Sequence, residues 1–125
     1  MIIGVDIGGT QTRAVMADKT GIVGSIEELT VKSGNPDALP RQVMNMIDRL
    51  VKENRIEEDE IGTVGISAPG PFGFSNGKRV LTTPNICGGL NANSGPDNDW
   101  VEIPLEEELS RHFDIIMEND AVSSA

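Results

Sequence analysis

The stretch Ile2-Ile3-Gly4-Val5-Asp6-Ile7-Gly8-Gly9-Thr10-Gln11-Thr12-Arg13-Ala14-Val15-Met16 opens the chain and indicates the kind of sheet that follows. Apolar residues at 2–7 predict a strand, the glycine pair predicts a turn, and residues 12–17 predict a second strand. A further turn at 18–21 leads into a third run that extends to Val31. Three strands joined by short turns predict an antiparallel meander.

The next segment changes from the two-residue period of a strand to the period of a helix. An apolar stripe extends to about Lys52, and it consists of Leu39, Val43, Met46, Ile47 and Leu50. Asn35-Pro36-Asp37 precedes the stripe and predicts the helix start, because Asn caps free N–H groups and Pro fits the first turn.

The rest of the chain carries signals for shorter elements. They are a buried strand at 61–67, a hairpin turn at Asn76-Gly77, a long surface loop at 88–99, a short helix from Pro104, a strand at 113–117 and a helical turn at 121–125. The order of all these elements predicts an α/β fold. We expect an RNase H-like half, in which a three-stranded antiparallel meander is extended by parallel strands with crossover helices.

Length and charge limit the classes of function. The 125 residues include 10 basic and 20 acidic side chains, and the net charge is −10. One domain is expected at this length. The negative charge argues against binding to nucleic acid or to an anionic membrane surface, since both attract clustered Lys and Arg. No stretch resembles a membrane span or a signal peptide, so we expect a cytoplasmic protein. Cys87 is the single cysteine, which excludes a disulfide within these residues.

Two motifs contain residue types suited to phosphate and proton chemistry. Asp6-x-Gly8-Gly9-Thr10-x-Thr12 combines a carboxylate and hydroxyl groups with glycines that let backbone N–H groups approach a phosphate. Glu118-Asn119-Asp120-Ala121 stands where a buried strand becomes a helix, and an Asp there can act as a base toward an alcohol. Taken singly, the first motif also fits a plain Gly-Gly turn, and the second also fits a helix cap.

Together with two further stretches, these motifs resemble one family in their order along the chain. The further stretches are Gly65-Ile66-Ser67-Ala68-Pro69-Gly70-Pro71 and Thr83-Pro84-Asn85. The set is similar to the N-terminal domain of the ROK family (repressors, open reading frames and sugar kinases), within the actin-like ATPase and sugar kinase superfamily. The resemblance covers nearly the whole chain. It implies a glucokinase-like enzyme that transfers a phosphoryl group from ATP to a hexose hydroxyl.

The resemblance also implies a role for each matching residue. The residues that would hold the ATP phosphates and Mg²⁺ are Asp6, Gly8, Gly9, Thr10 and Thr12, with Asp6 reaching the metal through water or phosphate. Asn85 and Asn119 would bind sugar hydroxyls, and Gly70 would contact the sugar through its backbone. Asp120 would bind the attacking hydroxyl and accept its proton as the catalytic base.

The family has a second, C-terminal domain, which we expect to lie outside residues 1–125. The resemblance implies that this domain completes the sugar and adenosine sites, carries a Cys-rich motif for structural zinc, and belongs to a homodimer or higher oligomer. We therefore expect residues 1–125 to form the N-terminal phosphate- and sugar-binding domain and to be inactive alone. The family's short Pro-Gly-Trp stretch is replaced here by an insertion at 86–99 before Trp100. Because the insertion adjoins the sugar pocket, the sequence does not determine which hexose is bound.

Two alternatives to a kinase remain at this point. One is a sugar-responsive transcriptional regulator of the same family, and the other is a sugar-binding module without catalysis. Regulators of the family carry a helix-turn-helix domain before the phosphate loop, whereas the loop motif here begins at Gly4 and the net charge is −10. Asp120 weighs against the non-catalytic module.

Overall fold

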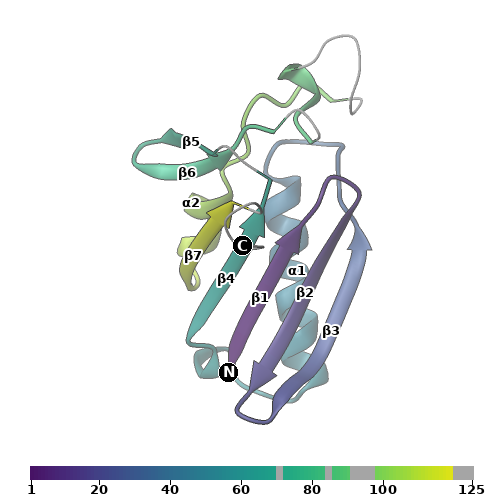
Figure 1. The fold of residues 1–125 in the computed structure, drawn as a ribbon, viewed down its shortest axis with the longest axis vertical. Coiled ribbons are helices and arrows are strands. Elements are labelled where there is room, and N and C mark those ends of the chain that lie inside the picture. The colour runs from purple at the N-terminus through teal and green to yellow at the C-terminus, as the bar shows by residue number, and fades with distance from the viewer. Residues whose placement is uncertain (70–71, 84–85, 91–97, 120–125) are drawn as a thin grey trace.

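A computed structural model describes residues 1–69, 72–83, 86–90 and 98–119. Its centre is a five-stranded sheet in the order β3-β2-β1-β4-β7 (Figure 1). The strands of this sheet are β1 (Ile2–Ile7), β2 (Gln11–Asp18), β3 (Gly21–Leu29), β4 (Thr63–Ala68) and β7 (Asp114–Asn119). The predicted fold class is confirmed, because an antiparallel meander is extended by parallel strands on the other side of β1.

The meander ends two residues before the predicted boundary at Val31. β3 stops at Leu29, and Thr30 turns inward to become buried. Its backbone N–H donates to the Thr10 carbonyl at 2.8 Å, so the chain after β3 is fastened to the turn between β1 and β2. The strand therefore ends where its backbone finds a partner in a loop rather than in a neighbouring strand.

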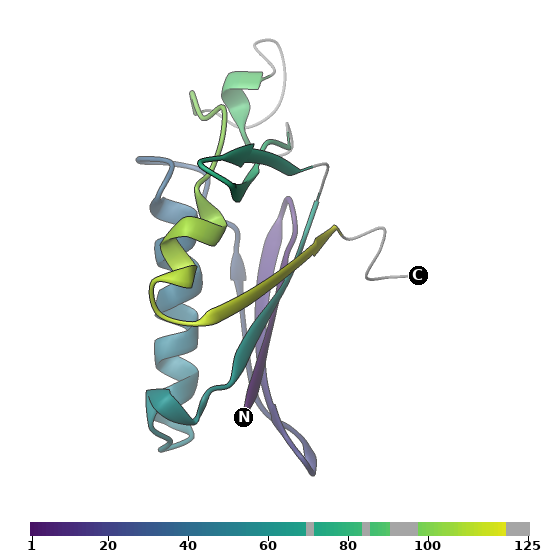
Figure 2. The same ribbon diagram turned by 90° about the vertical axis from the view of Figure 1, so that its left-hand side faces the viewer.

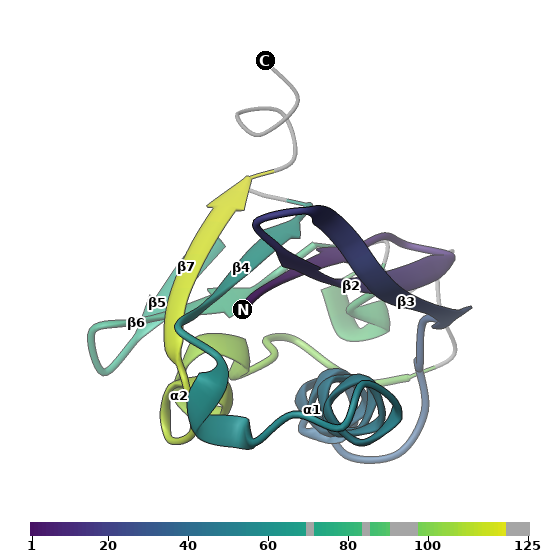
Figure 3. The same cartoon turned by 90° about the horizontal axis from the view of Figure 1, so that it is seen from below.

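Helices α1 (Ala38–Glu53) and α2 (Leu105–Ser110) form the crossovers, and both lie on one face of the sheet (Figures 2 and 3). The predicted apolar stripe of α1 is buried between helix and sheet. The predicted cap at Asn35 lies two residues before the observed cap position, Asp37. Asp37 precedes the first helical residue without a side-chain cap, and Asn35 contributes only its carbonyl, which accepts the Ala38 N–H at 2.9 Å.

The core fills the space between the sheet and the two helices. It is built from the inward-facing residues of alternate strand positions, among them Ile3, Val5, Ile7, Ala14, Met16, Val64 and Ile66. The opposite face of the sheet carries exposed apolar side chains, including Ile2, Ile22 and Ile116. Within the described residues, the sheet is thus covered on one face only.

A small hairpin stands beyond the carboxyl ends of the parallel strands (Figure 1). It consists of β5 (Phe72–Ser75) and β6 (Lys78–Leu81), with the turn at Asn76-Gly77 as predicted. Both turn residues have positive φ, at 53° and 78°, which is the backbone conformation that makes Asn-Gly a favoured two-residue hairpin turn. A bridge between Leu81 and Ile103 links the hairpin to the segment before α2.

Two predicted boundaries near the end of the chain are corrected. The strand predicted at 113–117 begins one residue later and extends to Asn119. Phe113 instead belongs to the turn after α2, where its N–H donates to the Leu109 carbonyl at 3.1 Å and its side chain is buried. The stretch at 88–99 is not a surface loop throughout, because Gly88–Leu90 forms a 3-10 turn and Gly88 is buried.

An ion pair fastens the edge strand β3 to α1. The Arg49 guanidinium donates to the Glu28 carboxylate, and the Gln42 side chain donates to the other carboxylate oxygen at 3.2 Å. The contact with Arg49 holds the pKa of Glu28 below its ordinary value of 4.5. A carboxyl whose pKa is lowered by folding stabilises the fold above its unfolded pKa, and this stabilisation is lost as pH falls through the folded value.

We expect Glu28→Gln to lower the free energy of unfolding at pH 7 by up to about 1 kcal/mol, the range of solvent-screened pairs. At an acidic pH below the pKa of Glu28 in the folded protein, the deficit should shrink toward zero, because the wild-type carboxyl is then protonated. Urea unfolding of both proteins at the two pH values measures this, with Glu57→Gln, on the exposed connector after α1, as the control. A deficit of equal size at both pH values would contradict the ion pair as its cause.

Candidate functional site

A row of polar side chains crosses the open face of the sheet near the carboxyl ends of its parallel strands. Asp6 of β1 pairs with Ser67 of β4, and Ser67 pairs with Glu118 of β7. On the other side of Asp6, the register places Arg13 of β2. Because directly paired residues project from the same face of a sheet, the four side chains form one line, which we call the polar row.

The polar row lies along a hollow of about 1000 Å³ on the face of the sheet that carries neither helix. Apolar residues form much of the rest of its surface, among them Ile2, Val15, Ile22 and Ile116. Ile2 is 64% exposed and Ile116 is 56% exposed. A ligand at the polar row would therefore meet charged groups beside an apolar sheet surface.

The turn between β1 and β2 begins two residues after Asp6, at Gly8. The Gly8 N–H donates to the Gln11 carbonyl at 2.9 Å, and this bond closes the turn around Gly9 and Thr10. A Cβ at Gly8 would lie 2.9 Å from the same carbonyl oxygen, which is closer than real side chains allow. Gly8 is therefore required by the shape of the turn, whereas Thr10 is exposed at its tip.

Thr12 has a different position from that of the other predicted phosphate-loop residues. Its side chain is fully buried, and its hydroxyl lies 2.8 Å from the Thr30 hydroxyl. The Thr30 hydroxyl donates its own hydrogen to the Gly8 carbonyl at 2.8 Å, so Thr12 is the donor to Thr30. Thr12 thus supports the turn from beneath, and its hydroxyl does not face the open side of the site.

This difference predicts that two isosteric substitutions change the free energy of unfolding by different amounts. Thr12→Val removes a buried hydrogen bond and should lower the free energy of unfolding by about 1 kcal/mol. Thr10→Val changes an exposed side chain and should stay within about 0.5 kcal/mol of the wild type. Urea unfolding of the two variants measures the difference. Equal stabilities would show that the Thr12–Thr30–Gly8 chain of hydrogen bonds does not hold the turn.

Gly70, Asn85, Asn119 and Asp120 were predicted from the sequence to bind the substrate or to act in catalysis. Asn119 is the last residue of β7, paired with Ala68 of β4, and it directly follows Glu118 of the polar row. Gly70, Asn85 and Asp120 lie outside the described residues. The structure therefore brings the turn and the polar row together, while the sugar-binding and base assignments stay predictions.

Three members of the polar row were not singled out from the sequence. Arg13, Ser67 and Glu118 reach the site because each is paired, directly or through one strand, with Asp6. Alternation along each strand gives the face of a residue, but the register between strands is needed to place these residues beside one another.

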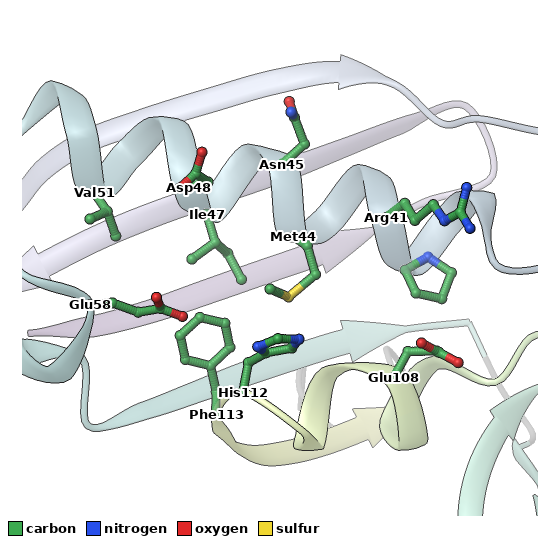
Figure 4. A pocket seen from close by; sticks show the side chains of 11 residues that line it. Arg41, Met44, Asn45, Ile47, Asp48, Val51, Glu58, Glu108, His112 and Phe113 are labelled. Atoms are coloured by element: carbon green, nitrogen blue, oxygen red, sulfur yellow. The ribbon is translucent and has the colours of Figure 1, made fainter.

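A second hollow, of about 540 Å³, lies on the helical side of the domain between α1 and the turn after α2 (Figure 4). Met44, Ile47 and Phe113 form its apolar part, and Glu58 and Glu108 lie at its margin. Because the helices and the polar row are on opposite faces of the sheet, this hollow is separate from the candidate site.

The described residues contain no group of three or more His, Cys, Asp or Glu side chains arranged to hold a metal ion. In the same ranges, none of the helices has the length and apolar character needed to cross a bilayer. Burial, with a smaller effect of the Glu102 charge, raises the pKa of the Cys87 thiol to about 11. Cys87 is therefore protonated at neutral pH and is unsuited to act as a nucleophile.

The strand order, the one-sided crossovers and the glycine turn after β1 define the class of protein: an α/β domain with the actin-like ATPase fold. Within this class, a family model described as "ROK family" matches residues 2–125, and the chain belongs to the ROK family. The resemblance identified from the four sequence motifs is confirmed.

A curated relative gives the same family relationship at the level of sequence. The glucokinase of Streptomyces coelicolor is 30% identical over 129 residues, an alignment that covers 100% of this chain and 34% of the relative. The glucokinase of Streptomyces lividans matches with the same figures. The chain thus spans about a third of the length of the curated relatives that it matches.

Solved structures show the same fold at lower sequence identity. The ROK hexokinase of Thermus thermophilus has a TM-score of 0.70 at 23% identity, covering 99% of this chain and 36% of that protein. A ROK family glucokinase of Streptomyces griseus, solved in complex with glucose and AMPPNP, has a TM-score of 0.65 at 22% identity, covering 96% of this chain and 33% of that protein.

Proposed function

We propose that residues 1–125 are the N-terminal phosphate- and sugar-binding domain of an ATP-dependent hexose kinase that acts on glucose or a close relative. One observation carries the proposal: in a ROK domain, the glycine turn and the polar row occur together at the carboxyl ends of the parallel strands. Open α/β sheets bind ligands at this edge. The glucokinases among the relatives support the substrate class.

The turn after β1 fits a polyphosphate. Gly8 lets the turn close tightly, Gly9 presents its backbone N–H without a side chain, and Thr10 adds an exposed hydroxyl at the tip. Asp6 supplies a carboxylate at the start of the turn, and carboxylate oxygens suit Mg²⁺, which keeps several of its waters beside phosphate. When bound, Mg²⁺ neutralises charge on the phosphates. Arg13, next to Asp6 in the polar row, adds a cation at the same edge.

We assign the sugar to the end of the polar row that is opposite Arg13, near Glu118. Asn85 and Asn119 would donate and accept hydrogen bonds with its hydroxyls, and the backbone of Gly70 would add a further contact. Asp120 would orient the attacking hydroxyl and accept its proton as the new O–P bond forms. Asn119 and Asp120 follow Glu118 directly in the chain, which supports their place at this end of the sheet.

The complete activity requires more than these residues, since relatives of the family are about three times as long. We propose that a C-terminal domain forms the opposite wall of the cleft, completes the adenosine site and carries a Cys-rich zinc motif, in a homodimer or higher oligomer. A single wall open to water gives each sugar hydrogen bond a net value of only about 0.5–1.5 kcal/mol. The loss of freedom on binding offsets most of this gain, so residues 1–125 should be inactive alone.

An assay of the full-length protein tests the proposal. ADP release is measured with ATP, Mg²⁺ and a panel of hexoses that includes glucose, mannose, galactose and N-acetylmannosamine. We expect turnover with glucose or an epimer of it, and release of ADP only when the hexose is present. Hexose binding without any ADP release would instead support the non-catalytic sugar-binding module. Absence of both binding and turnover across the panel would refute the proposed function.

A further inference from the structure

Asn98, near the end of the insertion that distinguishes this chain, makes four hydrogen bonds with its side chain. The side-chain oxygen accepts the N–H groups of Gly88 at 2.7 Å and Trp100 at 3.1 Å. The side-chain nitrogen donates to the carbonyls of Lys32 at 2.8 Å and Ile86 at 3.0 Å. An Asn side chain has two donors and can accept two hydrogen bonds, so the bonding capacity of Asn98 is fully used.

These bonds join three segments that are distant in sequence. Lys32 belongs to residues 32–34 between β3 and α1, which we call the 32–34 segment. Ile86 and Gly88 belong to residues 86–88, which we call the 86–88 segment. Trp100 adds a second link to the 32–34 segment, because its buried ring N–H donates to the Gly34 carbonyl at 2.9 Å. Of the Asn98 and Trp100 side chains, only that of Asn98 also bonds the 86–88 segment.

The 86–88 segment has a second attachment, to Thr83 on the other side of positions 84–85. Ile86 and Cys87 are fully buried, and their N–H groups donate to the Thr83 carbonyl at 3.1 Å and 2.8 Å. Thr83 and Ile86 flank positions 84–85 in the sequence. Asn98 therefore fixes the backbone that leads directly from Asn85, the residue assigned to a sugar hydroxyl.

We propose that Asn98 is a positioning residue for hexose binding, acting through the 86–88 segment on Asn85. The inference rests on the proposed function, because it presumes that Asn85 contacts the sugar. The insertion then has a definite structural role. Its last residues bond the 86–88 segment, which follows Asn85 in the sequence, to the 32–34 segment.

The test uses Asn98→Asp in the full-length protein, with Trp100→Phe as the matched control. The Asp side chain still accepts from Gly88 and Trp100, but it has no hydrogen to donate and places a charge against the Lys32 and Ile86 carbonyls. Trp100→Phe removes the other hydrogen bond to the 32–34 segment and keeps the Asn98 bonds to Gly88 and Ile86. We expect both variants to lower the melting temperature, so stability alone does not distinguish them.

The distinguishing measurement is the hexose Kd by calorimetry without ATP, together with kcat and the ATP KM. Asn98→Asp should raise the hexose Kd about tenfold or more while the ATP KM stays within about twofold, and Trp100→Phe should leave the hexose Kd within about twofold. Asn98→Ser keeps one donor and one acceptor and should give an intermediate Kd. It provides the same comparison if Asn98→Asp does not fold.

An unchanged hexose Kd in folded Asn98→Asp or Asn98→Ser would overturn the inference and leave the proposed function intact. An equal rise in Trp100→Phe would also overturn it, since the effect would then be general loosening. A wild-type protein that binds no hexose would refute the proposed function itself, and the positioning role of Asn98 with it.

Discussion

Asp120→Asn in the full-length protein is expected to lower kcat by about 10²-fold or more while the hexose Kd changes only a few-fold. The amide has the shape of the carboxylate and can still hydrogen-bond a sugar hydroxyl, but it cannot accept the proton when the hydroxyl attacks phosphorus. The loss should therefore appear in the chemical step and not in the binding of the sugar.

Steady-state kinetics with calorimetric hexose binding measures this split. Asp114→Asn is the matched control, because Asp114 is an exposed carboxylate at the first residue of β7, paired with Thr63. Its kcat should stay within about twofold of the wild type. Turnover near the wild-type level in Asp120→Asn would remove Asp120 from the role of base.

Gly9→Val is expected to raise the ATP KM by at least about tenfold, or to abolish turnover, without unfolding the domain. Gly9 lies in the turn closed by the bond from Gly8 to Gln11, where we assign the ATP phosphates. A β-branched side chain there would occupy the volume that the phosphates require. The hexose Kd measured without ATP should change little, since the sugar is assigned to the other end of the polar row.

The control for Gly9→Val is the same change at Gly62, before β4 and at the far end of the sheet. A Cβ at Gly62 would lie 3.9 Å from the Met1 carbonyl, an ordinary contact, and the residue is exposed. Gly62→Val should leave the ATP KM within about twofold. Unchanged ATP kinetics in a folded Gly9→Val protein would refute the assignment of the phosphates to this turn.

The elements of the fold were predictable because periodicity, turn residues and helix signals agree with one another along the chain. The apolar stripe from Leu39 to Leu50 and the Asn76-Gly77 turn are local patterns, and both were confirmed. The boundary at Val31 was not correct, since tertiary hydrogen bonds decide it, and the helix start at Asn35 was placed too early because Asn35 bonds through its carbonyl and not its side chain. Thr30, for example, leaves the sheet to bond the turn at Gly8 and Thr10.

The candidate site was predictable in part. The glycines and Asp6 were found because only particular residue types permit a close turn beside a carboxylate. Thr12 has the same chemistry as Thr10, yet it faces the interior, and Arg13, Ser67 and Glu118 join the site through strand register. Residues that are two apart on a strand share a face, but this rule does not relate Thr10 to Thr12, because Thr10 lies in the turn and Thr12 lies in β2.

The strand order has a consequence for how the domain is made. The first strand synthesised, β1, is the middle of the five-stranded sheet, and the later strands add outward from it: β2 and β3 on one side, β4 and β7 on the other. No strand has to enter between two that are already paired. A nascent chain can therefore build the sheet from its centre in the order of translation, and the hairpin of β1 and β2 can close first because its strands leave the ribosome before the others.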